Sequence, residues 1–374
     1  MIFPSKKYKI ALIGFSLSEG GGEKVMANLS VFFDNMGIEV HNIIVLDKVT
    51  YPYKGKLLNL GLLKKNSNGF LNKLKRLTLL KKYLKQNNFD FIIDFRPRTK
   101  HWQELIIAKF IYKSSTIYTI HSYWIHYYMP NNSFLTRLIY NHCYANVAIV
   151  KPMKELVEIK HHLTNVATIA NPVNINEILN KWDEPTTEID FDYIIAIGQY
   201  ESNVKQFDKL IEAYANSILP KKEIHLVILG KGNNEFYQNI AAENDILEWV
   251  HFLGYQDNPF KFLKKARFLV LSSKNEGFAN VLVESLVCQT PVVAFDCLCG
   301  PSEIIIDKKN GLLVENQNIN KLTEAINLFI NDQELYDYCK KNAFQSIQHF
   351  TLENIGKQWL RLMKMEDILN NNPS

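Results

Sequence analysis

Apolar positions along the chain fall into short runs that alternate with longer segments of helical periodicity. Short apolar runs bounded by polar residues are typical of strands buried on both faces of a sheet. In the first half of the chain we expect a helix over 22–37, ended by Gly37, and strands over 9–15, 39–46, 89–95, 115–121 and 145–150. Strands separated by helices favour a parallel sheet covered on both faces.

A second series of the same kind follows an Asn-Pro turn signal at 171–172. It predicts helices over 207–219 and 318–330, and strands over 192–198, 224–230, 250–254, 267–273 and 291–295. We therefore expect an α/β protein with two doubly wound, Rossmann-like domains, 1–170 and 171–350, and a C-terminal segment, 351–374, that is helical over 351–369. Ligands of such sheets bind beyond the carboxyl ends of the strands, so the chemistry is expected in the loops that follow strands, at a cleft between the domains.

Composition agrees with two globular domains, because 22% of the 374 residues are charged and 47% are hydrophobic. No apolar stretch reaches the roughly 18 uncharged residues of a membrane-spanning helix, so none is expected. The five cysteines are an odd number and form no cluster with histidines in the sequence. This usage favours a reduced, cytoplasmic protein over a disulfide framework or a zinc site.

Charge is divided unevenly between the two halves. Residues 1–170 hold 24 Lys and Arg against 10 Asp and Glu, a net charge of +14, and the remainder has a net charge of −9. Within the basic half, residues 72–86 have the pattern of an amphipathic helix with the cations Lys73, Lys75, Arg76, Lys81, Lys82 and Lys85. Such a helix suits anionic lipid headgroups, although a solvated helix packed by its leucines has the same pattern.

The stretch "EGFANVLVE", 276–284, follows an expected strand and opens an expected helix. Backbone amides of Gly277, Phe278 and Ala279 at that helix start would attract a phosphate. Glu276 just before the helix and Glu284 one turn inside it could accept hydrogen bonds from hydroxyls. The pair therefore fits a polyhydroxylated ligand joined to a diphosphate, and the alternative is two ordinary solvated glutamates.

Three further loops carry candidate chemistry after strands. The glycines at 20–22 permit close approach of a ligand to the backbone, or form a flexible turn, and they do not match G-x-G-x-x-G. Lys205 precedes a helix and could neutralise a phosphate, or be merely solvated. His121 ends a strand, where a histidine can act as a hydrogen-bond partner or acid–base group, or serve the structure alone.

In this order the loops resemble those of the retaining GT-B glycosyltransferases of family 4. "EGFANVLVE" looks like the family's signature of two glutamates separated by seven residues. "GGGEKVMANLS", "ANPVN", "GKG", "HFLGY" and "GPSEII" are also similar to family segments, so the resemblance spans nearly the whole chain. It implies the GT-B fold, with a C-terminal helix that packs back towards the N-terminal domain.

The resemblance also implies a reaction and its residues. A glycosyl group would pass, with retained configuration, from a nucleotide-diphosphate sugar on the C-terminal domain to an acceptor hydroxyl on the N-terminal domain, without a metal or other cofactor. Glu276, His121 and Lys205 would be catalytic. The donor would be bound by Gly20, Gly21, Gly198, Gln199, Lys205, Gly230, Glu276, Gly277, Phe278, Ala279, Asn280 and Glu284. The family often has arginine where Gln199 stands, so either the donor would bind weakly or another cation such as Lys231 would compensate.

"FDCLCGPSEII" is similar to the variant found in transferases of bacterial surface polysaccharides, which often use polyprenyl-diphosphate-linked acceptors. With the basic N-terminal half, this favours a peripheral enzyme on the inner face of the cytoplasmic membrane that uses a UDP-sugar in lipopolysaccharide, O-antigen or capsule assembly. Two alternatives stay open: a GT-B sugar-nucleotide epimerase, and a non-enzymatic protein that binds anionic surfaces. No nucleic-acid-binding motif is present, so no nucleic acid partner is expected.

Overall fold

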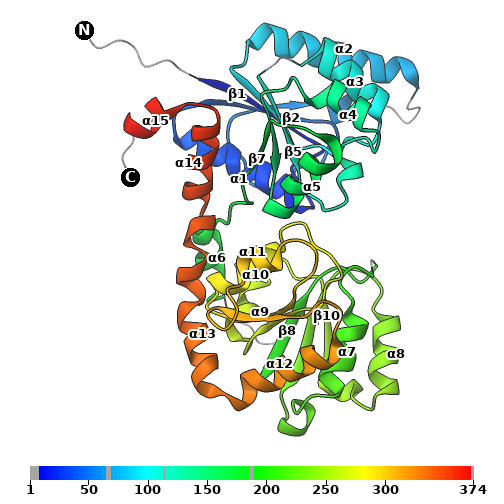
Figure 1. Cartoon of the computed structure of the whole chain (residues 1–374), viewed down its shortest axis with the longest axis vertical. Coiled ribbons are helices and arrows are strands. Elements are labelled where there is room, and N and C mark those ends of the chain that lie inside the picture. Colours follow the sequence, from blue (N-terminus) through cyan, green and yellow to red (C-terminus); the bar gives the residue numbers. More distant parts are fainter. Residues whose placement is uncertain (1–7, 65–68, 113–114, 185–188, 202, 372–374) are drawn as a thin grey trace. The chain divides into compact units, whose positions relative to one another are not determined.

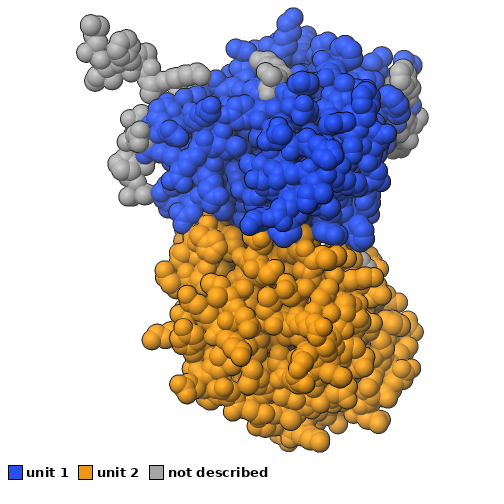
Figure 2. Space-filling view, viewed as in Figure 1, with its two compact units in different colours: residues 1–172, 352–374 blue, residues 173–351 orange. Residues whose placement is uncertain are grey.

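The computed structural model describes residues 8–64, 69–112, 115–184, 189–201 and 203–371. The chain divides into two compact units, which Figure 2 shows in blue and orange. Unit 1 consists of Met1–Pro172 and Leu352–Ser374, and unit 2 of Val173–Thr351. The C-terminal segment therefore belongs to the same unit as the N-terminal half.

Unit 1 is built on a seven-stranded parallel sheet of order β3-β2-β1-β4-β5-β6-β7. Its strands are β1 (Lys9–Gly14), β2 (Glu39–Ile44), β3 (Lys56–Asn59), β4 (Phe91–Asp94), β5 (Thr116–Ile120), β6 (Ala145–Ala148) and β7 (Val166–Thr168). The five strands expected from apolar runs are confirmed. The two edge strands, β3 and β7, were not predicted, because they are short and only partly buried.

Helices cover both faces of this sheet (Figure 1). They are α1 (Gly21–Asn35), α2 (Phe70–Asn87), α3 (His101–Phe110), α4 (Ser133–Tyr140), α5 (Lys151–His161), α14 (Leu352–Leu362) and α15 (Glu366–Asn371). The strand order runs in one direction through β1 and β2 and in the other through β4 to β7, so right-handed crossovers place α1 on one face and α2 to α5 on the other.

The C-terminal helix α14 packs against α1 through a glycine. A Cβ atom at Gly356 would lie 2.4 Å from the Phe32 ring, so only glycine allows this approach. The tail is not one helix as expected: α14 ends at Leu362, Lys364 has a positive φ of 55°, and α15 follows.

Unit 2 contains a six-stranded parallel sheet of order β10-β9-β8-β11-β12-β13. Its strands are β8 (Tyr193–Ile197), β9 (His225–Leu229), β10 (Val250–Gly254), β11 (Leu269–Leu271), β12 (Val292–Phe295) and β13 (Gly311–Val314). Its helices are α6 (Ile175–Lys181), α7 (Phe207–Ala215), α8 (Glu235–Glu243), α9 (Phe260–Lys265), α10 (Asn280–Val287), α11 (Pro301–Ile304), α12 (Ile319–Asn331) and α13 (Gln333–Ser346).

The core of unit 2 lies between the sheet and its helices, where Ile194, Ile228, Phe268 and Phe295 are fully buried. The five expected strands are confirmed, and edge strand β13 was not predicted. Among the described residues of both units, no helix is long and apolar enough to cross a membrane.

Candidate active site

Two predicted site residues of unit 2 form an ion pair. Lys205 Nζ lies 2.6 Å from Glu276 Oε1, and the side chains are 20% and 12% exposed. Lys205 stands in the loop between β8 and α7, and Glu276 in the loop between β11 and α10. The carboxyl ends of adjacent parallel strands meet at one sheet edge, which explains why these loops come together.

Two serines that follow β11 fix this pair, and sequence reasoning missed both. Ser273 Oγ donates a hydrogen bond of 2.6 Å to Glu276 Oε1, so this oxygen accepts from a hydroxyl and an ammonium group. Ser272 Oγ donates to the carbonyl oxygen of Lys205 at 2.7 Å. The Ser-Ser pair at the end of an apolar strand is the signal that could have indicated them.

Gly198 and Gly230 lie beside Lys205 for steric reasons. A Cβ atom at Gly198 would be 2.6 Å from Cγ of Lys205, and one at Gly230 would be 2.2 Å from the carbonyl oxygen of Gly198. Absence of side chains at both positions lets the ends of β8 and β9 approach each other and lets the Lys205 chain lie across Gly198. Gln199, the next residue, is exposed, as is Lys231.

The predicted phosphate site needs free backbone amides at the start of α10, and the structure provides them only in part. Ala279, at the N-cap, has a left-handed φ of 56°, and the helix proper begins at Asn280. The Phe278 side chain is buried against Phe350 at a ring distance of 5.1 Å, so only its backbone is available to a ligand. Glu284 lies within α10, half-buried, as expected.

A glycine of another loop supports this helix start. Gly300 has a φ of 97°, and a Cβ atom there would lie 3.1 Å from the backbone carbon of Phe278. The loop after β12 can therefore rest directly on the loop before α10. Cys297 in the same loop is buried, which together with the Glu276 charge raises the pKa of its thiol to about 12. This cysteine is therefore an uncharged packing group.

In unit 1, His121 lies at the end of β5 next to the start of α1. A Cβ atom at Gly22 would be 3.6 Å from the imidazole ring. Burial, and secondarily the charge of Arg98, lowers the pKa of His121 to about 4, and a hydrogen bond with Asn171 opposes this shift. The ring is therefore neutral at physiological pH.

The tautomer of His121 follows from its neighbour Thr119. The Thr119 hydroxyl donates its single hydrogen to the carbonyl oxygen of Asp94 at 3.1 Å. The same oxygen lies 3.0 Å from Nε2 of His121, and in the tautomer that satisfies both contacts Nε2 carries the proton and donates. Nδ1 is then an acceptor, which suits a hydroxyl donor and not a phosphate.

The glycines at 20–22 lie at the start of α1, as expected, with Gly20 at the N-cap, but an unexpected carboxylate lies in the first turn of the helix. Gly20 has a φ of 120°, and a Cβ atom there would lie 2.6 Å from Oε2 of Glu23. Burial raises the pKa of Glu23, while a hydrogen bond with its own backbone lowers it. Gly21 is exposed at the first position of α1. A ligand at Gly20 and Gly21 would meet this carboxylate as well as the backbone amides.

The basic segment forms α2, but its six cations are not equivalent. Lys73, Lys75, Lys81, Lys82 and Lys85 are exposed. The Arg76 guanidinium is instead turned to the protein, where Nη2 donates to the carbonyl oxygen of Val45. Arg76 is therefore not part of the outward-facing set in which the sequence placed it, because its longer, planar group reaches a backbone acceptor.

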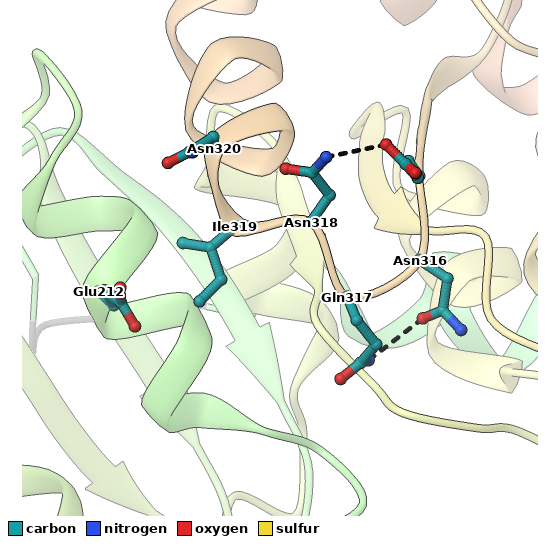
Figure 3. Close-up of a pocket in the computed structure, with 7 residues that line it drawn as sticks. Glu212, Asn316, Gln317, Asn318, Ile319 and Asn320 are labelled. Carbon is teal, nitrogen blue, oxygen red and sulfur yellow. Dashed lines mark hydrogen bonds between the residues drawn. The ribbon is translucent and has the colours of Figure 1, made fainter.

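Unit 2 has a hollow of about 490 Å³ lined by Glu212 of α7 and residues 315–320, whose side chains are drawn in Figure 3. Within it, Asn318 donates to Glu315 at 2.8 Å and Gln317 donates to Asn316 at 3.1 Å. Two glutamates of like charge disfavour a diphosphate, and no predicted donor-binding residue lines the hollow. Its link to the site is indirect: Gln206, next to Lys205, donates to Gln317 at 2.9 Å.

In the part of the chain that the structure describes, no group of three or more His, Cys, Asp or Glu side chains is arranged to hold a metal ion. In this site Lys205 offers a positively charged group and Glu276 a negatively charged one, and Glu284 follows within α10. The arrangement combines a cation for an anionic leaving group with carboxylates that accept from hydroxyls.

Comparisons with known proteins agree with this chemistry. Residues 177–346 match the model of the family described as Glycosyl transferases group 1. Over 371 residues, 95% of this chain and 99% of the relative, the chain is 28% identical to the N-acetylgalactosamine-N,N'-diacetylbacillosaminyl-diphospho-undecaprenol 4-alpha-N-acetylgalactosaminyltransferase of Campylobacter jejuni.

Solved structures show the same fold at low sequence identity. A glycosyltransferase from Rickettsia africae superposes with a TM-score of 0.76 at 17% identity, covering 98% of this chain and 100% of that one. The Anabaena protein HepE, solved in complex with UDP, gives 0.73 at 16% identity, covering 96% and 100%. The chain therefore has the GT-B fold of these structures, and its residues 177–346 match the group 1 glycosyltransferase family, which supports glycosyltransferase activity.

Proposed function

We propose that the protein transfers a hexose or N-acetylhexosamine from a UDP-sugar to a hydroxyl of a lipid-linked glycan, with retention of the anomeric configuration. The observation that carries the proposal is the Lys205–Glu276 pair at the carboxyl edge of the unit 2 sheet. The ammonium group of Lys205 would neutralise the departing diphosphate, and Glu276 would accept hydrogen bonds from sugar hydroxyls. Electrostatic stabilisation by lysine and backbone amides would serve in place of a metal or other cofactor.

Supporting contacts come from the remaining predicted residues. Amides of Gly277, Phe278 and Ala279 would bind phosphate or sugar oxygens, and Glu284 would accept from the ribose. Neutral His121 would accept a hydrogen bond from a sugar hydroxyl at Nδ1. Its position next to the α1 start supports a joint role with Gly20 and Gly21.

The donor and acceptor classes rest on relatives. The Campylobacter relative forms an alpha linkage on a diphospho-undecaprenol-linked glycan, and HepE was solved with UDP. By analogy we assign UDP as the nucleotide and a polyprenyl-diphosphate-linked glycan of lipopolysaccharide, O-antigen or capsule as the acceptor. An alpha product from an alpha-linked nucleotide sugar requires retention, which fits family 4. A lipid-linked acceptor would place the enzyme at the membrane surface, with unit 1 as the acceptor domain and unit 2 as the donor domain.

Thermal unfolding of the purified protein with UDP, GDP, ADP or CMP, each at about 1 mM, tests the donor site, because a ligand of the folded state raises its stability. We expect UDP alone to raise the unfolding temperature, and Lys205→Met to abolish the shift. Transfer from the matching UDP-sugar panel to a lipid-linked acceptor then follows. No shift with any nucleotide would contradict the proposal, and UDP-sugar interconversion without acceptor would favour an epimerase.

A further inference from the structure

Helix α3 carries a carboxylate on its inner side and large apolar side chains on its outer side. Glu104 is buried and its Oε2 lies 3.0 Å from Nη2 of Arg96, which also pairs with Asp94. The side chains of Trp102 and Phe110 are 74% and 69% exposed. A helix on a protein in water normally has the opposite distribution. The outer side of α3 is thus built to meet something other than water.

The apolar positions form a regular surface over two neighbouring helices. Trp102, Ile106 and Phe110 recur every four residues on α3, so they form one stripe. On α4, which packs against α3, Phe134 and Leu138 are also four residues apart and exposed. Figure 1 shows α3 and α4 side by side on unit 1. We call these five residues the apolar face.

Cations border the apolar face. Lys109 of α3 and Arg137 of α4 are exposed next to it along their helices. Helix α2 adjoins α3, because Leu77 and Leu80 line one cavity of about 260 Å³ together with Gln103 and Ile107 of α3. The exposed lysines of α2, described above, therefore lie on the helix beside the apolar face, on the same side of the sheet.

We propose that the apolar face inserts into the interfacial region of an anionic bilayer, with the lysines of α2, Lys109 and Arg137 at the lipid headgroups. Aromatic and aliphatic groups bordered by cations are the composition that binds such interfaces. A second copy of the chain is a poorer occupant, because it would bring two basic halves, each of net charge +14, against each other. This proposal depends on the proposed function in one respect: a lipid-linked acceptor is the reason why the enzyme would dock on a membrane.

Vesicle sedimentation with the full chain tests the proposal. Vesicles of phosphatidylcholine with phosphatidylglycerol are compared with vesicles of phosphatidylcholine alone. Trp102→Ser with Phe110→Ser, and separately Phe134→Ser with Leu138→Ser, should each weaken binding to the anionic vesicles by about tenfold or more, because inserted side chains of this size are lost. Phe236→Ser, a matched change at a side chain of unit 2 that is 62% exposed, should leave binding unchanged.

Fluorescence reports insertion directly. Emission of Trp102 should shift to shorter wavelength on anionic vesicles and be quenched by brominated lipid, and this change should be absent in Trp102→Phe. Turnover of a water-soluble acceptor should be unaffected by the apolar-face variants, which separates this proposal from failure of the proposed function. Wild-type vesicle binding in both double variants would overturn the proposal, as would light scattering that shows a dimer in the wild type and a monomer in the variants.

Discussion

Lys205 Nζ and Glu276 Oε1 lie 2.6 Å apart, although 71 residues separate them in the sequence. Both side chains are largely removed from water, so each charge depends on the other. A nucleotide sugar would replace this contact. Its diphosphate would pair with the ammonium group of Lys205, and its hydroxyls would donate hydrogen bonds to Glu276. In the proposed site the pair would hold two binding groups in position before the donor arrives, which would lower the cost of organising them.

Removal of either member should abolish most transfer while the fold persists. We expect Glu276→Gln and Lys205→Met each to lower kcat/KM by about 10²–10³-fold, the usual cost of one electrostatic contact to the reacting group. Steady-state transfer from a radiolabelled UDP-sugar measures this loss. Full activity of Glu276→Gln would sink the assignment of the site.

The double variant Glu276→Gln with Lys205→Met separates a structural role from a catalytic one. Each single change leaves a partly buried charge without its partner and should lower the unfolding temperature. Removal of both charges should recover part of this loss but none of the transfer, a coupling that a double-mutant cycle quantifies. Recovery of transfer together with stability would mean that the pair only holds the loops.

Gly198→Ala should mainly lower transfer activity, whereas Gly230→Ala should mainly lower stability. The new Cβ atom at 198 would meet the Lys205 side chain, which can shift, so transfer should fall by roughly tenfold to a hundredfold, with a smaller loss of stability than at 230. The one at 230 would meet the backbone carbonyl of Gly198, which cannot easily move, so stability should fall by about 1–3 kcal/mol. Equal loss of stability in the two variants would contradict this distinction.

Most strands that the sequence patterns predict have neighbours on both sides, and edge strand β10 is the exception. β1, β4 and β5 lie inside their sheet and read as continuous apolar runs. Edge strands such as β3 have one neighbour and a mixed burial pattern, so they carry no apolar run to recognise. The break in the tail at Lys364 is equally silent in the sequence, because no glycine or proline marks its left-handed φ.

The sequence predicts which loops form the site, but it does not predict which side chains pair within it. Strand ends place Lys205 and Glu276 at one sheet edge, but their pairing and the role of Ser273 depend on rotamers. Helix orientation was missed for a similar reason. Arg76 was predicted to be a surface cation, yet it turns inward because the Val45 carbonyl offers it a partner. Glu104, for which no prediction was made from the sequence, is buried because Arg96 pairs with it.

Gln199→Arg should strengthen nucleotide binding. Gln199 is exposed next to Gly198. The family that the sequence resembles often has an arginine at this position, which acts together with the lysine that corresponds to Lys205. A charged hydrogen bond to a phosphate contributes about 1.5–3 kcal/mol, so the Kd of UDP should fall by roughly tenfold or more. Isothermal titration measures the change, with Gln238→Arg on exposed α8 as a control for net charge. Unchanged affinity in Gln199→Arg would indicate that the phosphates lie elsewhere.

Acidification should destabilise unit 1 through His121. Burial, with the charge of Arg98, lowers its pKa from 6.5 to about 4, so between these values the unfolded chain binds a proton that the folded chain does not. Stability is therefore greatest above pH 6.5 and falls as the pH drops towards 4, by up to about 1.4 kcal/mol per pH unit for this group. His161, whose pKa burial also lowers to about 4, adds a contribution of the same sign. Urea unfolding from pH 4 to 8 should show a shallower pH dependence in His121→Gln than in the wild type. An unaltered slope in His121→Gln would show that the imidazole is already accessible to protons in the folded state, and would remove the argument for its neutral, acceptor role at the site.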